Sequence, residues 1–209
     1  MYRELNNKQY NITIGLILLW GFAVNAIMCT FFPHVFSAWN PTTVLIGYFI
    51  AAVSGICMST FSDNPIISFT GYNLVVLPIG VVLSISLQDY YVSSIAQAFI
   101  LTTLITILMI VVSTVKPEIF ESMGSTLFIC LTGVVVIEFM MILFGFGRPQ
   151  WWDWIVALLF CAYIGYDWSK AQEKRKTLDN AVDSVVDLYL DIINLFMRLL
   201  SSSGSKKSK

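Results

Sequence analysis

The chain has 209 residues, of which 57% are hydrophobic and only 12% are charged. Because a soluble domain carries about 25% charged residues, a water-soluble core of this size cannot hide so much apolar surface. The formal net charge of -1 gives no sign of a nucleic-acid or acidic-polymer partner, so the composition points to a lipid bilayer as the main partner.

Six apolar runs follow the N-terminal segment in chain order. Most contain about 18–25 residues, the length that a helix needs to cross ~30 Å of hydrocarbon. The runs also lack the two-residue alternation that is typical of barrel strands. We therefore predict six strongly hydrophobic helices, over Ile12–Phe32, Val44–Phe61, Ile66–Leu87, Tyr91–Val115, Gly124–Gly147 and Trp151–Trp168.

Proline and small residues punctuate these runs. Five of the six prolines lie at or beyond the ends of runs, whereas Pro78 lies inside the third run, where we expect a kink. The second run carries Gly47, Ala51 and Gly55, a spacing of small residues that permits close contact with another helix. The alternative is that this spacing arises by chance in a helix rich in glycine and alanine.

Basic residues set the expected orientation. The N-terminal segment carries Arg3 and Lys8, and the loop after the sixth run carries Lys170, Lys174, Arg175 and Lys176. With the N-terminus in the cytoplasm, six crossings return this loop to the cytoplasmic side, as the positive-inside rule prefers. We expect one transmembrane domain over residues 1–200 and a flexible basic tail over residues 201–209.

Metal and catalytic motifs are sparse. The four cysteines lie in four different apolar runs without a CxxC pair, so we expect buried thiols rather than disulfides or metal ligands. The single histidine, His34, permits neither a convincing zinc site nor a Ser/His/Asp triad. We therefore expect no enzyme activity and no tightly bound cofactor. The cysteines are Cys29, Cys57, Cys130 and Cys161.

The last apolar segment, Asn180–Leu200, differs from the others because it is acidic. Aspartates occur every four residues, at Asp179, Asp183, Asp187 and Asp191. Each step of four rotates a helix by ~40°, so the four carboxylates form one slowly drifting stripe. The helix would lie on the membrane surface, form a soluble amphipathic tail, or stand inside the bundle with its carboxylates facing inward. We favour the third arrangement, in which an ionisable residue marks a functional site.

A further acid, Asp167, ends the sixth run, and only a short basic loop separates that run from the last helix. We expect Asp167 and Asp191 to approach each other. Two carboxylates in a low dielectric share a proton. Protonated, they hold the two helices together; deprotonated, they repel each other and offer oxygen ligands to a transient Ca²⁺. The alternative for Asp167 is an ordinary interfacial carboxylate paired with Lys170 or the basic loop.

Two stretches carry a family resemblance. Leu188–Leu200, with the string LYLDIINLF, resembles the C-terminal signature of the Bax inhibitor-1 family, and Tyr163–Asp167 is similar to the preceding helix of that family. The resemblance implies seven helices with the C-terminal one central among the other six. It also implies a pH-sensitive calcium leak, in which Asp167 and Asp191 form the pH sensor and gate. Eukaryotic relatives lie in the endoplasmic reticulum and other membranes, where they lower stored calcium and suppress cell death.

The chain departs from the family pattern in three places. The end of the second helix reads FSDNPIISF, with Asp63 where relatives can carry an arginine that interacts with the gate. Gln97 replaces an expected acid, and Glu138 lies deep in the fifth run, where it must be protonated, paired or hydrated. These three residues and Asp187 are secondary candidates. Losing a cationic partner favours the protonated pair. We therefore expect flux to close at a higher pH than in an arginine-bearing relative.

Other functions compete with the leak. The same carboxylates would serve a proton-coupled transporter, and the chain would otherwise bind partners in cell-death or stress control without flux of its own. An intramembrane aspartyl protease is disfavoured, because Asp191 follows Leu188-Tyr-Leu rather than a glycine-rich motif. We expect the bacterial inner membrane as the location. The terminal KKSK, similar to a dilysine retrieval signal, makes the endoplasmic reticulum the alternative.

Overall fold

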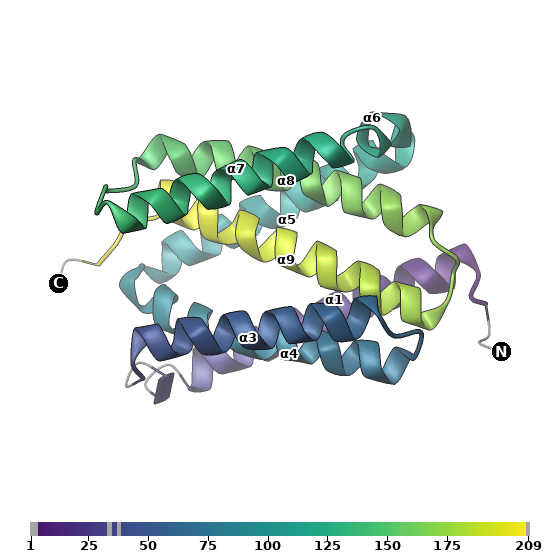
Figure 1. Cartoon of the computed structure of the whole chain (residues 1–209), viewed down its shortest axis with the longest axis horizontal. Helices are drawn as coiled ribbons and strands as arrows, with labels where there is room; N and C mark the ends of the chain where they lie inside the picture. Colours follow the sequence, from purple (N-terminus) through teal and green to yellow (C-terminus); the bar gives the residue numbers. More distant parts are fainter. Residues whose placement is uncertain (1–3, 33–34, 37–38, 208–209) are drawn as a thin grey trace. The chain divides into compact units, whose positions relative to one another are not determined.

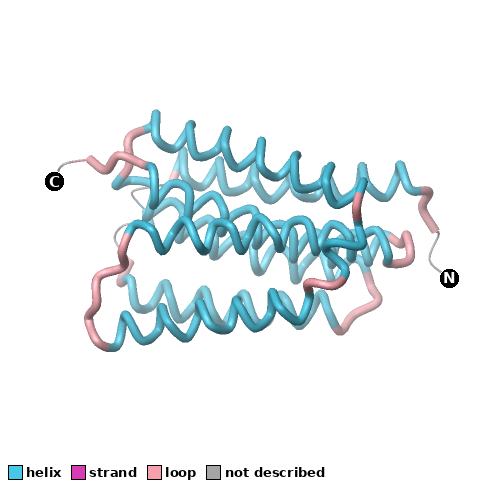
Figure 2. The backbone as a smooth tube through the Cα atoms, turned by 90° about the horizontal axis from the view of Figure 1, so that it is seen from above, coloured by secondary structure: helices cyan, strands magenta, loops and turns pink. Residues whose placement is uncertain are grey.

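The computed structural model describes residues 4–32, 35–36 and 39–207, so the expectation for His34 lies outside the described residues. Within these ranges the fold is all-α, with helices joined by loops and turns (Figure 2).

All seven segments expected to be helical fold as helices, shown in chain order in Figure 1. They are α1 (Asn7–Phe31), α3 (Pro41–Thr60), α4 (Pro65–Ser86), α5 (Val92–Val115), α7 (Gly124–Leu143), α8 (Gln150–Glu173) and α9 (Leu178–Ser203). The structure adds a short helix, α6 (Pro117–Glu121), and a 3-10 turn, η1 (Leu87–Asp89). α8 extends beyond the predicted end at Trp168, because backbone hydrogen bonding continues through polar residues after the apolar run stops.

Local sequence explains where helices begin. The Asn6 side chain accepts a hydrogen bond from the Gln9 backbone at 2.8 Å, and the Gln9 side chain accepts one from Asn6 N–H at 3.2 Å. This capping box satisfies two of the free N–H groups at the start of α1. Asn64 caps α4 in a similar way, and Pro65 occupies the first turn, where no N–H partner is needed.

In the part of the chain that the structure describes, four helices are long and apolar enough to cross a membrane: Asn7–Phe31, Pro65–Asp89, Val92–Val115 and Gly124–Leu143. Only 11% of the most apolar window of α5, and 11% of that of α7, is buried inside the protein. So much exposed apolar surface is stable only against lipid, which makes the chain a multi-pass membrane protein. α8 and α9 do not meet the same criterion of length and composition, so the predicted seven-helix bundle with a central C-terminal helix stays a prediction.

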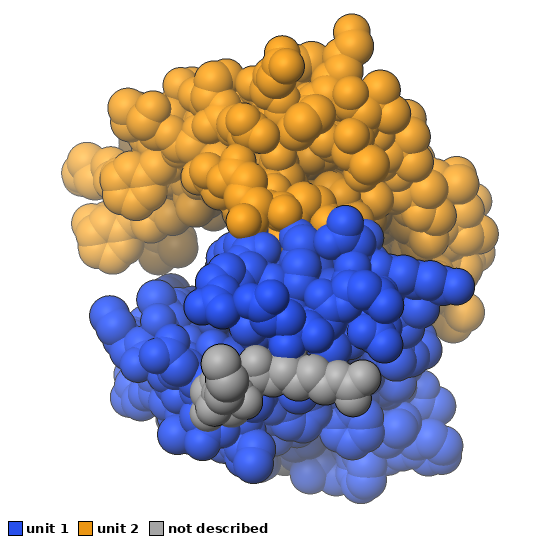
Figure 3. Space-filling model, turned by 90° about the vertical axis from the view of Figure 1, so that its right-hand side faces the viewer, with its two compact units in different colours: residues 1–90, 174–189 blue, residues 91–173, 190–209 orange. Residues whose placement is uncertain are grey.

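The chain divides into two compact units, which are coloured separately in Figure 3. Unit 1 comprises residues 1–90 and 174–189, and in it α4 packs against α1 and α3. Unit 2 comprises residues 91–173 and 190–209, and in it α8 packs against α5, α6 and α7. α9 passes from unit 1 to unit 2 after Tyr189, so both units share this helix. The expectation of one domain over residues 1–200 stays a prediction.

Intramembrane amides hold helices of unit 1 together. Asn25 of α1 is buried and donates a hydrogen bond to the Tyr189 hydroxyl of α9. The Asn73 side chain of α4 accepts a hydrogen bond from the Trp20 indole N–H of α1 at 3.1 Å. Asn25 is buried, so water does not compete with its hydrogen bond to Tyr189 and the bond stabilises the contact of α1 with α9.

The N-terminal segment meets the basic loop between α8 and α9. Leu5 N–H donates to the Lys176 carbonyl at 2.7 Å, and Arg175 forms an ion pair with Glu4 at 2.8 Å. Both segments belong to unit 1 and lie at the same end of the molecule (Figure 1). This arrangement agrees with the expectation that the N-terminus and the basic loop share one side of the membrane.

Two glycines allow α3 and α4 to approach closely. A Cβ atom on Gly55 would clash with the Gly71 carbonyl oxygen, and a Cβ on Gly71 would clash with the Gly55 carbonyl oxygen. The close contact predicted from the small-residue spacing is therefore present at Gly55. It is absent at Gly47, where a Cβ would meet nothing within 4 Å.

We predict that Gly55→Ala lowers the free energy of unfolding by about 1–3 kcal/mol, because the two backbones must separate. The matched control, Gly47→Ala on the same helix, should leave it unchanged or raise it by up to about 1 kcal/mol, because alanine favours a helix more than glycine does. Denaturant titration in mixed micelles measures both variants. Equal effects of the two substitutions would contradict the close contact of α3 and α4.

Candidate functional site

Asp191 and Asp167, the two carboxylates expected to form the gate, both belong to unit 2. Asp191 lies on α9 and is only 6% exposed, whereas Asp167 lies on α8 and is half-buried. Tyr163, one helical turn before Asp167 on α8, interacts electrostatically with both carboxylates. The structure thus gives Asp167 and Asp191 a shared tyrosine neighbour.

Neighbouring helices fix this part of α8. Gly165 lacks a side chain because the Phe120 ring of α6 occupies the space that a Cβ would fill. The Gly165 carbonyl accepts a hydrogen bond from the Ser113 hydroxyl of α5 at 2.6 Å. The Trp168 indole N–H donates to Thr114 of α5 at 2.9 Å. The Tyr163–Asp167 segment is therefore held rigidly against α5 and α6, which presets the position of its polar side chains.

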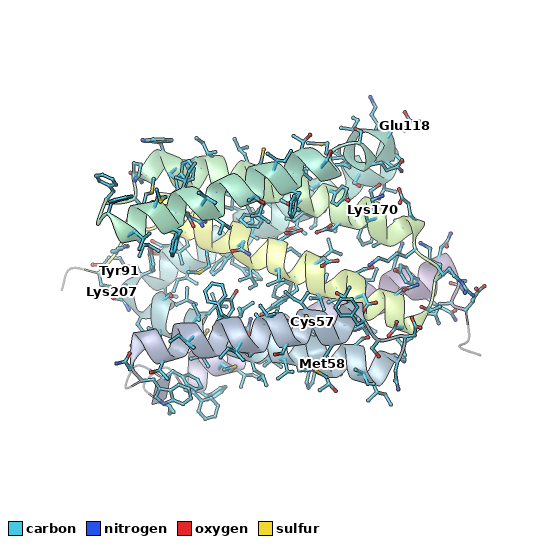
Figure 4. The ribbon with its side chains drawn as sticks, in the orientation of Figure 1. Cys57, Met58, Tyr91, Glu118, Lys170 and Lys207 are labelled. Atoms are coloured by element: carbon cyan, nitrogen blue, oxygen red, sulfur yellow. The ribbon has the colours of Figure 1, made fainter. Side chains whose placement is uncertain are left out.

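Lys170 and the basic loop are the alternative partners expected for Asp167, and that alternative stays open. The Lys170 ammonium group forms an ion pair with Glu173 at 2.9 Å and lies 5.8 Å from the centre of the Tyr166 ring. Lys170 and Glu118 mark the end of unit 2 where α6 and the end of α8 lie (Figure 4).

The acidic stripe of α9 divides into different environments. Asp179 is 6% exposed and accepts a hydrogen bond from Ser68 of α4 at 2.8 Å. Asp183 accepts one from Ser59 of α3 at 2.5 Å. Asp187 is exposed and belongs to unit 1, whereas Asp191 belongs to unit 2. The stripe is therefore not uniform, because Asp179 and Asp191 are buried, Asp183 is half-buried and Asp187 is exposed.

A polar cavity of about 330 Å³ lies in unit 1 beside the first half of α9. Asp183 and Asp187 line it together with Lys174, so acidic and basic groups face the same space. The other lining residues are Ile56, Ser59, Thr60, Asn180 and Val186.

Two of the secondary candidates, Gln97 and Asp63, are exposed. Gln97 lies on an exposed face of α5, and Asp63 lies in the loop between α3 and α4. Among the described residues no group of three or more His, Cys, Asp or Glu side chains is arranged to hold a metal ion. Calcium contact with Asp167 and Asp191 therefore stays a prediction.

Glu138 of α7 is paired, which was one of the three states that its position in an apolar helix allowed. Arg198 of α9 binds it with two parallel hydrogen bonds, of 2.6 Å from Nη1 to Oε1 and 2.9 Å from Nη2 to Oε2. The Trp152 indole N–H of α8 also donates to Oε1 at 3.0 Å. A two-pronged arginine–carboxylate pair of this kind is among the strongest charged contacts in proteins.

The same arginine reaches a second carboxylate. Arg198 Nη1 lies 3.0 Å from Oδ1 of Asp153 on α8, whose side chain is only 4% exposed. Ser201 of α9 donates to Oδ2 of Asp153 at 2.7 Å. Arg148 approaches Asp153 at 3.3 Å and Glu138 at 3.8 Å, so two arginines neutralise two acids. We call Glu138, Arg148, Asp153 and Arg198 the ion network.

Sequence reasoning identified Glu138 but missed Arg198, Asp153 and Arg148. A signal was available, because Arg198 interrupts the apolar stretch LFMRLL and Asp153 lies among tryptophans. A charge in such a segment requires a partner of opposite sign. The sequence could not say which helix supplies the partner.

We predict that Arg198→Met lowers the free energy of unfolding by about 3 kcal/mol or more, because Glu138 and Asp153 lose their buried counter-charge. The double variant Glu138→Gln with Arg198→Met should recover much of this loss, since one acid then remains for Arg148. Denaturant titration in micelles measures both. Wild-type stability of the single variant would show that the ion network contributes nothing.

Comparison with known proteins agrees with these features. The family model described as "Inhibitor of apoptosis-promoting Bax1" matches residues 3–208. Protein LIFEGUARD 3 of Arabidopsis thaliana is 40% identical over 84 residues, covering 39% of this chain and 34% of the relative. Protein LIFEGUARD 4 of the same plant is 36% identical over 112 residues, covering 51% of this chain and 45% of the relative.

A Helicobacter pylori protein is 34% identical over 111 residues, covering 52% of this chain and 46% of the relative. The chain thus spans between a third and a half of the length of these relatives. The family consists in general of non-enzymatic membrane proteins. With a family model that matches nearly its whole length, the chain belongs to the Bax inhibitor-1 family of multi-pass membrane proteins.

Proposed function

We propose that the chain is a pH-sensitive calcium leak channel in which Asp167 and Asp191 form the proton sensor and gate. The observation that carries the proposal is that both carboxylates lie near enough to Tyr163 to interact with it electrostatically, all three residues belonging to unit 2. The burial of Asp191 and the match of the chain to the Bax inhibitor-1 family support it.

The physical chemistry of a carboxylate pair supplies a switch. When one carboxyl is protonated, it donates a hydrogen bond to the other, a contact worth about 1.5–3 kcal/mol when one partner is charged. When both are ionised, carboxylates about 4 Å apart repel each other by about 4 kcal/mol at an effective dielectric constant of 20. Deprotonation therefore reverses the sign of the interaction between α8 and α9 at this level, and higher pH favours separation.

The separated carboxylates suit a hard cation. Calcium prefers oxygen ligands and tolerates irregular coordination, so two carboxylates and water are enough for transient contact during passage. A leak requires weak binding, because an ion that is held tightly does not leave the pathway. Calcium enters here as the transported ion and the proton as the regulator.

We predict calcium influx into proteoliposomes that rises between about pH 6 and pH 8, the range in which a buried, coupled carboxylate pair titrates. Asp191→Asn should abolish or shift this pH dependence, because an amide cannot ionise. Asp187→Asn is the matched control, because Asp187 lies one turn earlier on the same helix and is exposed.

An internal calcium dye reports the influx. If wild-type vesicles stay as tight as empty ones at every pH, the leak fails. The proton-coupled transporter and the partner-binding function would then take its place, and saturation with a required counter-ion would identify the transporter.

We predict that Tyr163→Phe moves the pH midpoint of influx upward by roughly one unit, because the hydroxyl favours the ionised carboxylates with which it interacts. Tyr166→Phe is the control, because this ring lies on the same helix and packs where Gly124 leaves space. The readout is the same dye titration. A midpoint that moves equally in both variants, or moves downward in Tyr163→Phe, would argue against a role for Tyr163 at the gate.

A further inference from the structure

The two halves of α9 are fastened in different ways. In unit 1 the first half is held by neutral donors, with Ser68 bonded to Asp179 and Asn25 bonded to Tyr189. In unit 2 the second half is held by charges, through the contacts of Arg198 with Glu138 and Asp153. Asp191 lies near the start of this second half.

The segment after α9 is also attached to unit 2. Ser205 N–H donates to the Ser94 hydroxyl of α5 at 3.0 Å, and the Ser205 carbonyl accepts from Tyr91 N–H at 3.3 Å. Tyr91 and Lys207 accordingly lie side by side (Figure 4). Within its described residues, the segment after residue 200 that we expected to be a flexible tail thus continues α9 to Ser203 and docks at the start of α5. The Gln150 side chain also donates to the Ser202 carbonyl, so several contacts besides the ion network hold the end of α9.

Helix geometry relates the ion network to the gate. Arg198 follows Asp191 by seven residues, which is about two turns or ~10 Å along the same face of α9. On α8, Asp153 precedes Tyr163 by ten residues, which corresponds to ~15 Å along the helix axis. Arg198 meets Asp153, and Asp191 interacts with Tyr163, so both contacts join the same two helices at different levels.

We propose that Arg198 is a positioning residue, which anchors the second half of α9 to α7 and α8 and thereby sets where Asp191 meets Tyr163 and Asp167. Its consequence for gating rests on the proposed calcium leak, whereas the anchoring rests on the ion network alone. The titratable groups that interact at this level are Tyr163, Tyr166 and Asp167 of α8, Asp191 of α9 and Cys130 of α7.

An arginine is required for this anchor. Its planar guanidinium engages both oxygens of Glu138 while Nη1 also reaches Asp153, so one side chain joins three helices. A lysine ammonium is a point charge and cannot reproduce the paired geometry. Arg148 differs, because it precedes α8 in a loop and is 43% exposed. Its contacts with the two acids are longer, at 3.3 and 3.8 Å, and it reaches α9 through one neutral partner, the Ser201 hydroxyl, at 3.2 Å.

The test compares backbone amide exchange in the full-length chain in lipid nanodiscs at one fixed pH. In Arg198→Met, amides of residues 190–203 should exchange at least about tenfold faster, because the local opening that exposes them becomes easier, while those of residues 178–189 stay unchanged. Arg198→Lys should show a smaller increase in the same segment. The matched comparison is Arg148→Met, which removes the same charge from the exposed side of the ion network and should accelerate exchange much less than Arg198→Met does.

The variant Glu138→Gln with Arg198→Met guards against misfolding, because it restores the charge balance; its residues 190–203 should still exchange faster than in the wild type. Unchanged exchange in Arg198→Met, or equal acceleration in Arg148→Met, would overturn the anchoring. Calcium influx then tests the gating role. A pH profile that moves in Arg198→Lys but not in Arg148→Met supports it, and profiles identical to the wild type overturn it. A wild type without influx refutes the proposed leak, while the exchange result still decides the anchoring.

Discussion

Charge inside an apolar helix assembly persists only with a partner, and this constraint organises the second unit of the protein. The Arg198 side chain is only 13% exposed. Its charge is balanced by Glu138 at 2.6 Å and Asp153 at 3.0 Å. Removing either sign leaves an uncompensated charge in a poorly hydrated region. The ends of α7 and α9 and the start of α8 are therefore obliged to stay together.

The same constraint explains how α9 can be the most polar of the long helices. Its aspartates are distributed among different partners: hydroxyl donors from α3 and α4 for Asp183 and Asp179, a cavity for Asp187, and the tyrosine of α8 for Asp191. The apolar helices, by contrast, expose most of their surface, as α5 and α7 do. Three of the four aspartates of this stripe are buried or half-buried in protein, whereas α5 and α7 expose apolar surface that suits lipid.

The proposed gate and the proposed anchor divide the labour along α9. In the proposed gate, the interaction between Asp167 and Asp191 changes from attraction to repulsion as the pH rises. The ion network around Arg198 contains opposite charges and favours one arrangement of the helices. A switch that moves one level of a helix needs a fixed level elsewhere, because otherwise repulsion would displace the whole helix without a defined opening. The charged half of α9 supplies such a fixed level within unit 2.

Local sequence was enough to predict where the helices lie and that their surroundings are lipid. Run length and the positions of proline fixed α1, α4, α5 and α7 to within a few residues, because a membrane helix satisfies its own backbone and needs only local apolar sequence. The strings LYLDIINLF and Tyr163–Asp167 were enough to indicate the family. The length of α8 was underestimated because hydropathy reports the surroundings of a helix and not its hydrogen bonding.

Tertiary packing sets which charges meet. Glu138 and Arg198 are 60 residues apart, and nothing in the intervening sequence specifies that α7 and the end of α9 are neighbours. Likewise, the regular spacing of the four aspartates suggested one acidic surface, whereas packing gives Asp179 and Asp183 hydroxyl donors, leaves Asp187 exposed at a cavity and buries Asp191. Periodicity is a property of a single helix, whereas the pairing of charges depends on how helices pack, and that is settled by the shapes and charges of all of them together.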